Sequence, residues 1–394
     1  MYKTKLYFKQ EWFFILGIFI AFNIMLSNYL YEFDSGSVAG GGTLRFILKV
    51  LSVFLLFLSQ PFPNKILVKK NILLILAFFL FLTSYIIYIP FSTWNELQFF
   101  NMYFVIFILF GIGYNQKFIP KLNHLLIYIF LFIWLPVDIY SLFSGNSLWE
   151  NKAFVGGVGN PSSYGMIIIY LLLINKGIFK PFRQSLINFL LFFSLFFTQA
   201  LMPILIMFIL SFFLYKKRNI LLILVSFTFF FLIYLDFLLE SLGLVDIHWF
   251  LKLQGLYEFG LSSSNESGSV SYRLEYFKDF YELFENLFVL LFGHVNGVSY
   301  NAGDGQYIAY VTSFGIPLFF FFLFSLFKIF YESKFFNLIN GFRMKLFFVA
   351  FLLILVTNRF LDYWPNAIII FFIINYIHQN KNNKIIFNNK TITT

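Results

Sequence analysis

The chain has no cysteine and very little charge. Without cysteine, no disulfide can hold a loop in place and no thiol can act as a nucleophile or metal ligand. Charged residues make up 12% of the 394 residues and hydrophobic residues 60%, whereas a soluble domain is about a quarter charged. A soluble chain of this size could not cover so much apolar surface. The composition therefore predicts an integral membrane protein.

Long apolar runs are abundant, and short polar stretches separate them. A transmembrane helix needs about 20 apolar residues, or somewhat fewer where the bilayer is thin. We predict an all-α, polytopic membrane protein with a single transmembrane domain over residues 1–394. The twelve predicted spans are 12–30, 44–60, 71–90, 97–114, 123–143, 162–175, 186–199, 201–215, 219–240, 307–327, 344–357 and 365–378.

The basic residues fall mostly on one side of these spans. A single helix over 186–215 would place one of its two flanking basic triplets outside, whereas two short helices that turn between Thr198 and Pro203 keep both inside. Most of the 28 basic residues are then inside, but only Glu11 and Glu332 of the 18 acidic residues are. The positive-inside rule therefore places both termini in the cytoplasm. Topology explains the net charge of +10, so nucleic acid is not needed as a partner.

One predicted outer loop, at 241–306, is much longer than the others. Long loops in compact folds are usually functional or disordered. A flexible stretch at 262–269 is followed by an amphipathic helix, which would lie on the membrane surface or cap a cavity. Its apolar face is formed by Leu274, Phe277, Tyr281, Phe284 and Phe288.

A glycine-rich segment at 154–163 precedes the sixth span. Asn160 followed by Pro161 is a favourable helix start, and that alone accounts for the residues. The functional alternative is anion binding. Glycines such as Gly159 let a ligand approach the backbone, a helix N-terminus offers free N–H groups, and Lys152 lies just upstream. A pyrophosphate would suit such a site.

A small set of cations falls on the predicted outer side, where topology does not account for them. Arg45 and Lys49 are spaced so that both can face one site from the same helix. Snorkelling, or pairing with a carboxylate such as Arg359 with Asp362, is the simpler explanation for each cation alone. An arginine cluster at the outer boundary would suit a phosphorylated lipid. The outer cations are Arg45, Lys49, Lys152, Arg273, Lys278 and Arg359.

The long loop ends in two glycine-rich turns that carry His294 and Asp304. Turn formation explains the glycines. An imidazole or carboxylate at the outer mouth of a span is also a candidate general base. The sequence has no zinc-site spacing, P-loop, nucleophile elbow or acidic pair for a divalent metal, so we expect neither a metal nor another cofactor.

The order of these features resembles the Wzy-type O-antigen polymerases, within the O-antigen polymerase/ligase superfamily. That family has ten to fourteen spans, one large periplasmic loop in its second half, and a Gly-Asn-Pro turn before a middle span. The resemblance covers residues 150 to 320 and is only topological before them. The matching segments are Gly159-Asn160-Pro161, Ser271-Tyr272-Arg273-Leu274-Glu275 through Leu291-Phe292-Gly293, Asp304-Gly305-Gln306-Tyr307 and Phe314-Gly315-Ile316-Pro317.

The resemblance implies a periplasmic glycosyltransferase in the bacterial inner membrane. Such enzymes join oligosaccharide repeat units carried on undecaprenyl pyrophosphate, and they work with a chain-length regulator and a flippase. We assign Arg273, Arg45 and Arg359 to the pyrophosphate and Asp304 to the acceptor hydroxyl, with His294 as the other candidate base. The polymer would be lipopolysaccharide O-antigen or a related surface polysaccharide.

The chain departs from the family at two points, and two rival functions stay open. Thr198 to Pro203 replaces a Ser-Arg pair, and Lys152 replaces an arginine. Ligases of the superfamily have histidine where this chain has Asp304, which favours a polymerase. A lipid-linked oligosaccharide flippase is the other rival. It is disfavoured because the halves show no repeat and because Asp138 and Asp236 lie near span ends rather than at mid-membrane.

Overall fold

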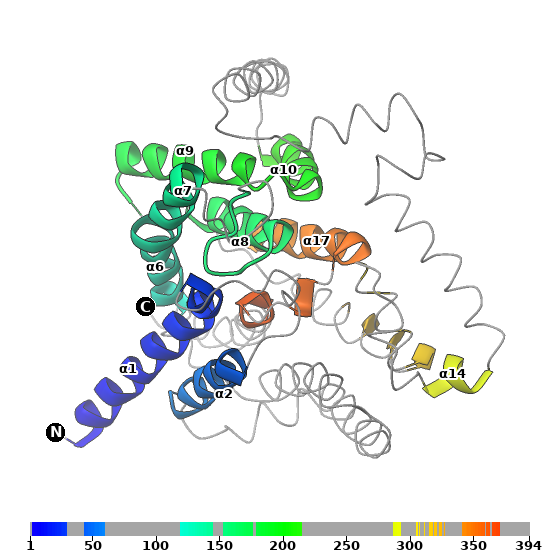
Figure 1. Cartoon of the computed structure of the whole chain (residues 1–394), viewed down its shortest axis with the longest axis horizontal. Helices are drawn as coiled ribbons and strands as arrows, with labels where there is room; N and C mark the ends of the chain where they lie inside the picture. Colours follow the sequence, from blue (N-terminus) through cyan, green and yellow to red (C-terminus); the bar gives the residue numbers. More distant parts are fainter. Residues whose placement is uncertain are drawn as a thin grey trace, which may run out of the picture.

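The computed structural model describes residues 2–29, 43–59, 119–144, 153–175, 179–214, 287–292, 341–358, 360–362 and 365–370, with scattered positions between 305 and 327. Every regular element in these ranges is helical, in agreement with the predicted all-α class. Figure 1 shows α8 near the middle of the described helices, with α9 along one side of it, α6 and α7 on another and α17 beyond its end.

Helices α1 (Tyr2–Asn23) and α2 (Thr43–Leu58) pack against each other. A Cβ on Gly17 would lie 2.9 Å from Leu56 Cγ, so the glycine allows this close approach. Helix α1 begins at Tyr2, so it includes the N-terminal lysines, and its apolar stretch begins at Gln10, close to the start of the predicted first span. A short 3-10 segment, Ile24–Tyr29, follows α1.

Helices α6 (Ile119–Ile129) and α7 (Leu135–Ser144) are joined by a π-helical segment, Phe130–Trp134. The Leu135 N–H donates to the Phe130 carbonyl, five residues earlier. Pro136 explains the wider turn, because proline has no N–H and its ring would clash with a carbonyl four residues before it. The stretch Leu122–Ser144 is long and apolar enough to cross a membrane.

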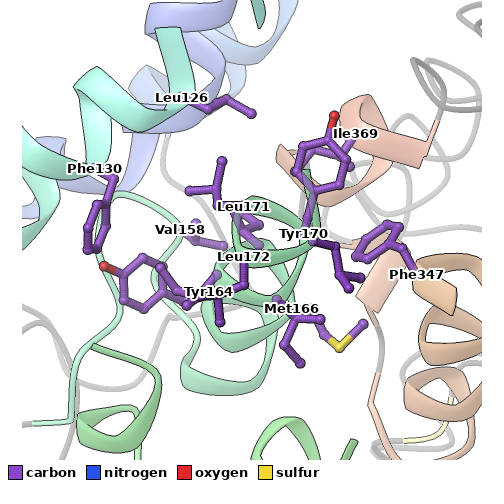
Figure 2. Close-up of a cluster of buried hydrophobic side chains, with 14 of the residues drawn as sticks. Leu126, Phe130, Val158, Tyr164, Met166, Tyr170, Leu171, Leu172, Phe347 and Ile369 are labelled. Carbon is purple, nitrogen blue, oxygen red and sulfur yellow. The ribbon is translucent and has the colours of Figure 1, made fainter. Parts of the chain in front are cut away.

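Helix α8 (Pro161–Ile174) is the most enclosed element. All its residues except Ser162 are buried, and it contacts α6, α9, α10 and α17. A helix that is apolar on every side is removed from water, either inside a protein core or in a membrane, and the contacts of α8 place it inside the bundle. In Figure 2, Tyr164 extends from α8 toward Phe130, and Tyr170 extends on another side, where Phe347 and Ile369 lie.

Helices α9 (Pro181–Phe197) and α10 (Leu201–Leu214) are separated by three residues. The predicted break after Thr198 is therefore confirmed. Gln199 has a positive φ of 53°, the left-handed conformation that commonly ends a helix. Helix α10 does not run back along α9 as a tight hairpin, because it packs mainly against α8 and α17.

Helix α17 (Gly341–Thr357) closes another side of α8, and α14 (Leu287–Phe292) is a short helix from the predicted outer loop. The Arg343 guanidinium donates to the Leu173 carbonyl at 2.9 Å, near the end of α8. A cation at this end suits the helix dipole. A 3-10 turn, Phe360–Asp362, follows α17, and residues 365–370 are helical.

Many large apolar side chains of the described helices are exposed. Besides Leu122–Ser144, the apolar helices in these ranges are between 10 and 17 residues long. The twelve-span arrangement therefore stays a prediction. The predicted spans at 71–90, 97–114 and 219–240, and all of the 241–306 loop except 287–292 and 305, lie outside the described residues.

Candidate functional site

The glycine-rich segment that was expected to meet substrate is buried inside the bundle. Every residue from Ala153 to Asn160 is buried. The Phe154 N–H donates to the Phe197 carbonyl at the end of α9 (2.9 Å), and the Met25 N–H donates to the Gly157 carbonyl (3.3 Å). The segment therefore joins the end of α1, the end of α9 and the start of α8.

A carboxylate from α7 holds this segment in place. Asp138 Oδ1 accepts hydrogen bonds from the N–H groups of Val155 (3.2 Å) and Gly156 (3.0 Å), and its side chain is only 2% exposed. Successive backbone N–H groups that converge on one point form an anion-binding nest. In this structure, the group in that nest is the protein's own carboxyl side chain.

The Asp138 carboxyl belongs to a small polar cluster inside the apolar core. The Tyr164 hydroxyl, from α8, lies close to the carboxyl. The same hydroxyl shares a 3.2 Å hydrogen bond with Ser194 Oγ, from α9. Buried polar groups are costly unless they are paired. This cluster therefore ties α7, α8 and α9 together at one level of the bundle.

Three glycines of the segment are required by space or by backbone conformation. Gly156 and Gly159 have positive φ values of 52° and 77°, which side chains other than glycine rarely adopt. A Cβ on Gly157 would lie 2.2 Å from the Phe22 carbonyl oxygen and 2.7 Å from Trp134 Nε1. Gly157 thereby allows close packing against the end of α1 and against Trp134 of the π-helical segment.

Trp134 fills the space beside these glycines. Its indole N–H donates to Asn23 Oδ1 at 3.1 Å. Its ring meets Tyr164 edge-on at a centroid distance of 5.5 Å and stacks on Phe22 at 6.1 Å. A buried indole needs such a partner for its N–H. Trp134 is the last residue of the π-helical segment, so that segment helps to set the direction of its ring.

The predicted helix start at Asn160 is confirmed. Asn160 has an extended backbone, its Oδ1 accepts from the Ser163 N–H at 2.9 Å, and Pro161 is the first helical residue. One of the free N–H groups of α8 is thus satisfied by the protein itself. A role for Gly159 and Asn160 in binding substrate stays a prediction, and it would require access to a buried segment.

The remaining predicted site residues are only partly described. Arg45 and Lys49 lie one turn apart on α2, as their spacing predicted, and the Lys49 side chain is half-buried. The Arg45 side chain lies outside the description. Six predicted residues lie outside the described residues altogether: Lys152, Arg273, Lys278, His294, Asp304 and Arg359.

Two neighbours of the unplaced Asp304 are described. Gly305 is buried, and the Tyr307 hydroxyl donates to the Leu352 carbonyl of α17 at 2.9 Å. The Tyr307 ring also meets Phe319 edge-on at 5.8 Å. Further along, Gly315 has a positive φ of 79°. Tyr307, the last residue of the Asp304 motif, is thus packed against α17.

Sequence reasoning missed the role of Asp138. The available signal was an acidic residue within an apolar helical run, since such residues are costly and are rarely without a partner. Its contacts with Val155 and Gly156 could not be predicted from local spacing. In the described part of the chain, no three His, Asp or Glu side chains gather as metal ligands would.

Comparison with known proteins does not identify a family for the chain. No protein-family model matches the chain, and none of the curated proteins matches it significantly.

Proposed function

We propose that the chain is a polytopic enzyme of the bacterial cytoplasmic membrane that polymerises oligosaccharide repeat units carried on a polyprenyl pyrophosphate. The observation that carries this proposal is the order of motifs along the sequence. A Gly-Asn-Pro helix start at 159–161 comes first, the Arg273-led segment of the long loop second, and Asp304 before Tyr307 third. This order resembles that of the O-antigen polymerases.

The outer surfaces of the described helices support the membrane part of the proposal. Phe132 on the π-helical segment, Phe143 on α7 and Phe182 on α9 are all more than two-thirds exposed. So many exposed large apolar side chains are unusual in a soluble monomer. In a bilayer, lipid acyl chains would cover these side chains. The short helices would then span with local thinning of the bilayer, or pair end to end across it.

The proposed reaction is a displacement at the anomeric carbon of the growing chain. The acceptor hydroxyl of a fresh lipid-linked unit forms the new C–O bond while the bond to the pyrophosphate breaks. The electron pair leaves with the polyprenyl pyrophosphate, and the hydroxyl proton passes to Asp304. Arg273, Arg45 and Arg359 would stabilise the negative charge on the leaving group. The donor already carries a good leaving group, so the step does not call for a nucleotide or a metal.

Deletion of the gene tests the reaction class. The surface glycan of the deletion strain, separated on a gel, should keep a single attached repeat unit and lose the ladder of longer chains. Loss of all attached sugar would identify a ligase. Lipid-linked units that accumulate on the cytoplasmic face would identify a flippase. An unchanged ladder would exclude the polymerase, ligase and flippase activities as functions of this protein.

Substitution of Arg273 tests the assigned site. We expect Arg273→Ala to abolish the ladder while the protein still inserts at normal levels. Lys381→Ala is the matched control, because it removes one positive charge from the predicted cytoplasmic side. A full ladder from the Arg273 variant would exclude this residue from the site.

A further inference from the structure

The first turns of α9 project from the bundle and combine exposed cations with exposed apolar side chains. Lys180 and Arg183 are exposed. Phe182 is 83% exposed, the largest value among the large hydrophobic side chains that the structure describes. Leu186 and Phe189 follow at 52% and 66%. Residues 180–189 are called the α9 entry below.

Along the axis of α9, the two cations lie at the start, and most of the exposed apolar side chains lie further along. Phe182, Leu186 and Phe189 recur at intervals of four and three residues, so they form one stripe on α9. Lys180 is the N-cap residue and Arg183 lies in the first turn, whereas Phe189 lies about 9 Å further along than Arg183, at 1.5 Å per residue. A helix that enters a bilayer obliquely would place its cations among headgroups and the rest of the stripe among acyl chains.

No carboxylate of the surrounding sequence is available to neutralise these cations. The chain contains no Asp or Glu from residue 151 to residue 235. Glu150 and Asp236, the nearest acidic residues in sequence, lie about thirty or more positions from Lys180. The α9 entry is therefore a basic surface with an apolar border, and its chemistry suits an anionic partner that also offers hydrocarbon.

We infer that the α9 entry binds the headgroup of an anionic phospholipid in the inner leaflet. Arginine can hold a phosphate with two parallel hydrogen bonds, and lysine adds a mobile second charge. Anionic leaflets attract basic segments next to a membrane helix. The rings of Phe182 and Phe189 would pack on the acyl chains. This inference rests on the predicted membrane setting and on the predicted cytoplasmic side of the α9 entry, and it is independent of the reaction proposed above.

Lipid retention by the purified full-length protein tests the inference. The protein in detergent is incubated with phosphatidylglycerol or with phosphatidylcholine, and the retained lipids are counted by native mass spectrometry. The wild type should retain the anionic lipid several-fold better than the zwitterionic one, and high salt should reduce this preference. Equal retention of the two lipids by the wild type would overturn the inference.

A pair of double variants locates the binding. Lys180→Gln with Arg183→Gln should lose most of the preference. Lys216→Gln with Arg218→Gln removes the same charge from the same predicted side and should keep the preference. Equal loss in the two double variants would show general attraction to basic loops and would refute a site at the α9 entry. A reporter fused to the C-terminus verifies that neither variant inverts the topology.

The exchange Lys180→Arg with Arg183→Lys keeps both charges and guards against a folding defect. This variant should retain phosphatidylglycerol to within about two-fold of the wild type, since the attraction depends mainly on charge near the surface. Loss of the lipid preference in this variant, with an unchanged elution profile, would contradict the electrostatic basis of the inference.

Discussion

Helices α8 and α9 are neighbours and both consist mainly of apolar residues, yet they occupy different environments. All residues of α8 except Ser162 are buried. Helix α9 buries Ile187, Leu191 and its last turn, whereas the stripe from Phe182 to Phe189 is exposed. Apolar character alone does not separate a central helix from a peripheral one, because lipid is as apolar as the protein core. The size of the side chains at the helix contacts does differ.

Gly165 shows how α8 obtains its central place. A Cβ at this position would lie 2.7 Å from Pro203 Cβ of α10. Small residues at such positions let two helices approach closely, which is the main source of packing between helices in lipid. The exposed stripe of α9 is instead made of bulky side chains. The comparison therefore predicts that substitutions in and around α8 disturb stability much more than those on the outer face of α9.

We expect the largest loss of stability from substitution of Tyr164, a fully buried residue of α8. Tyr164→Ala removes a buried ring that packs against Trp134 and should cost about 3–5 kcal/mol, as for other large aromatic truncations. Phe189→Ala on α9 is the matched truncation of an exposed ring. Thermal unfolding of the two variants in detergent measures the difference. Equal losses would show that α9 is as enclosed as α8.

Asp138→Ala should have the next largest effect. It leaves the N–H groups of Val155 and Gly156 without their acceptor in a buried place, at about 1–3 kcal/mol for each unpaired group. Asp138→Asn keeps an oxygen at the accepting position and should lose clearly less. Thermal unfolding distinguishes the two. If the Asn variant were as unstable as the Ala variant, the negative charge rather than the hydrogen bonds would hold the segment.

Gly157→Ala tests the close packing of the segment on α1. The added methyl group would meet a backbone carbonyl, which cannot rotate away, and we expect a cost of about 1–3 kcal/mol. The control is Ser185→Ala, which also introduces alanine but does so on the exposed part of α9. If the Gly157 variant had the same melting temperature as the wild type, the segment would be able to move away from Phe22 at little cost in free energy.

Local rules predicted those features of the fold that depend on adjacent residues. The all-helical class follows from the apolar runs, the helix start at Asn160 from the Asn-Pro pair, and the break after Thr198 from the flanking basic triplets. The predicted span from residue 12 lies largely within α1, which begins ten residues earlier. The positive-inside rule assigns lysines to a side of the membrane, but it does not say whether they are helical.

The features that were not predicted depend on contacts between distant segments, with one local exception. The π-helical segment at Phe130–Trp134 has a local cause in Pro136, and that signal was present in the sequence. The hydrogen bonds from Val155 and Gly156 to Asp138 join residues that are 17 and 18 positions apart, and no spacing rule predicts them. The predicted arginine site depends on several loops, so nothing in the sequence fixes its geometry.

Asn160→Ala should have a smaller effect than the core substitutions. It removes the side-chain oxygen that caps α8, and the typical cost is about 1 kcal/mol. Asn160→Ser retains a cap and should restore most of the loss. Thermal unfolding measures both variants, and the glycan ladder then gives a second comparison. If the Ser variant were stable but made no ladder, Asn160 would have a role in binding beyond its cap.

The smallest effect is expected on the exposed stripe of α9. Phe189→Leu keeps an apolar side chain on a surface that no described part of the protein covers, so the change should stay within about 0.5 kcal/mol, as for most surface substitutions. The same exchange at Phe347, which is fully buried beside Tyr170, is the control and should cost more. Thermal unfolding in detergent compares the two. If Phe189→Leu were the more harmful exchange, the stripe would be covered by protein rather than by lipid, and the placement of α9 at the periphery would be wrong.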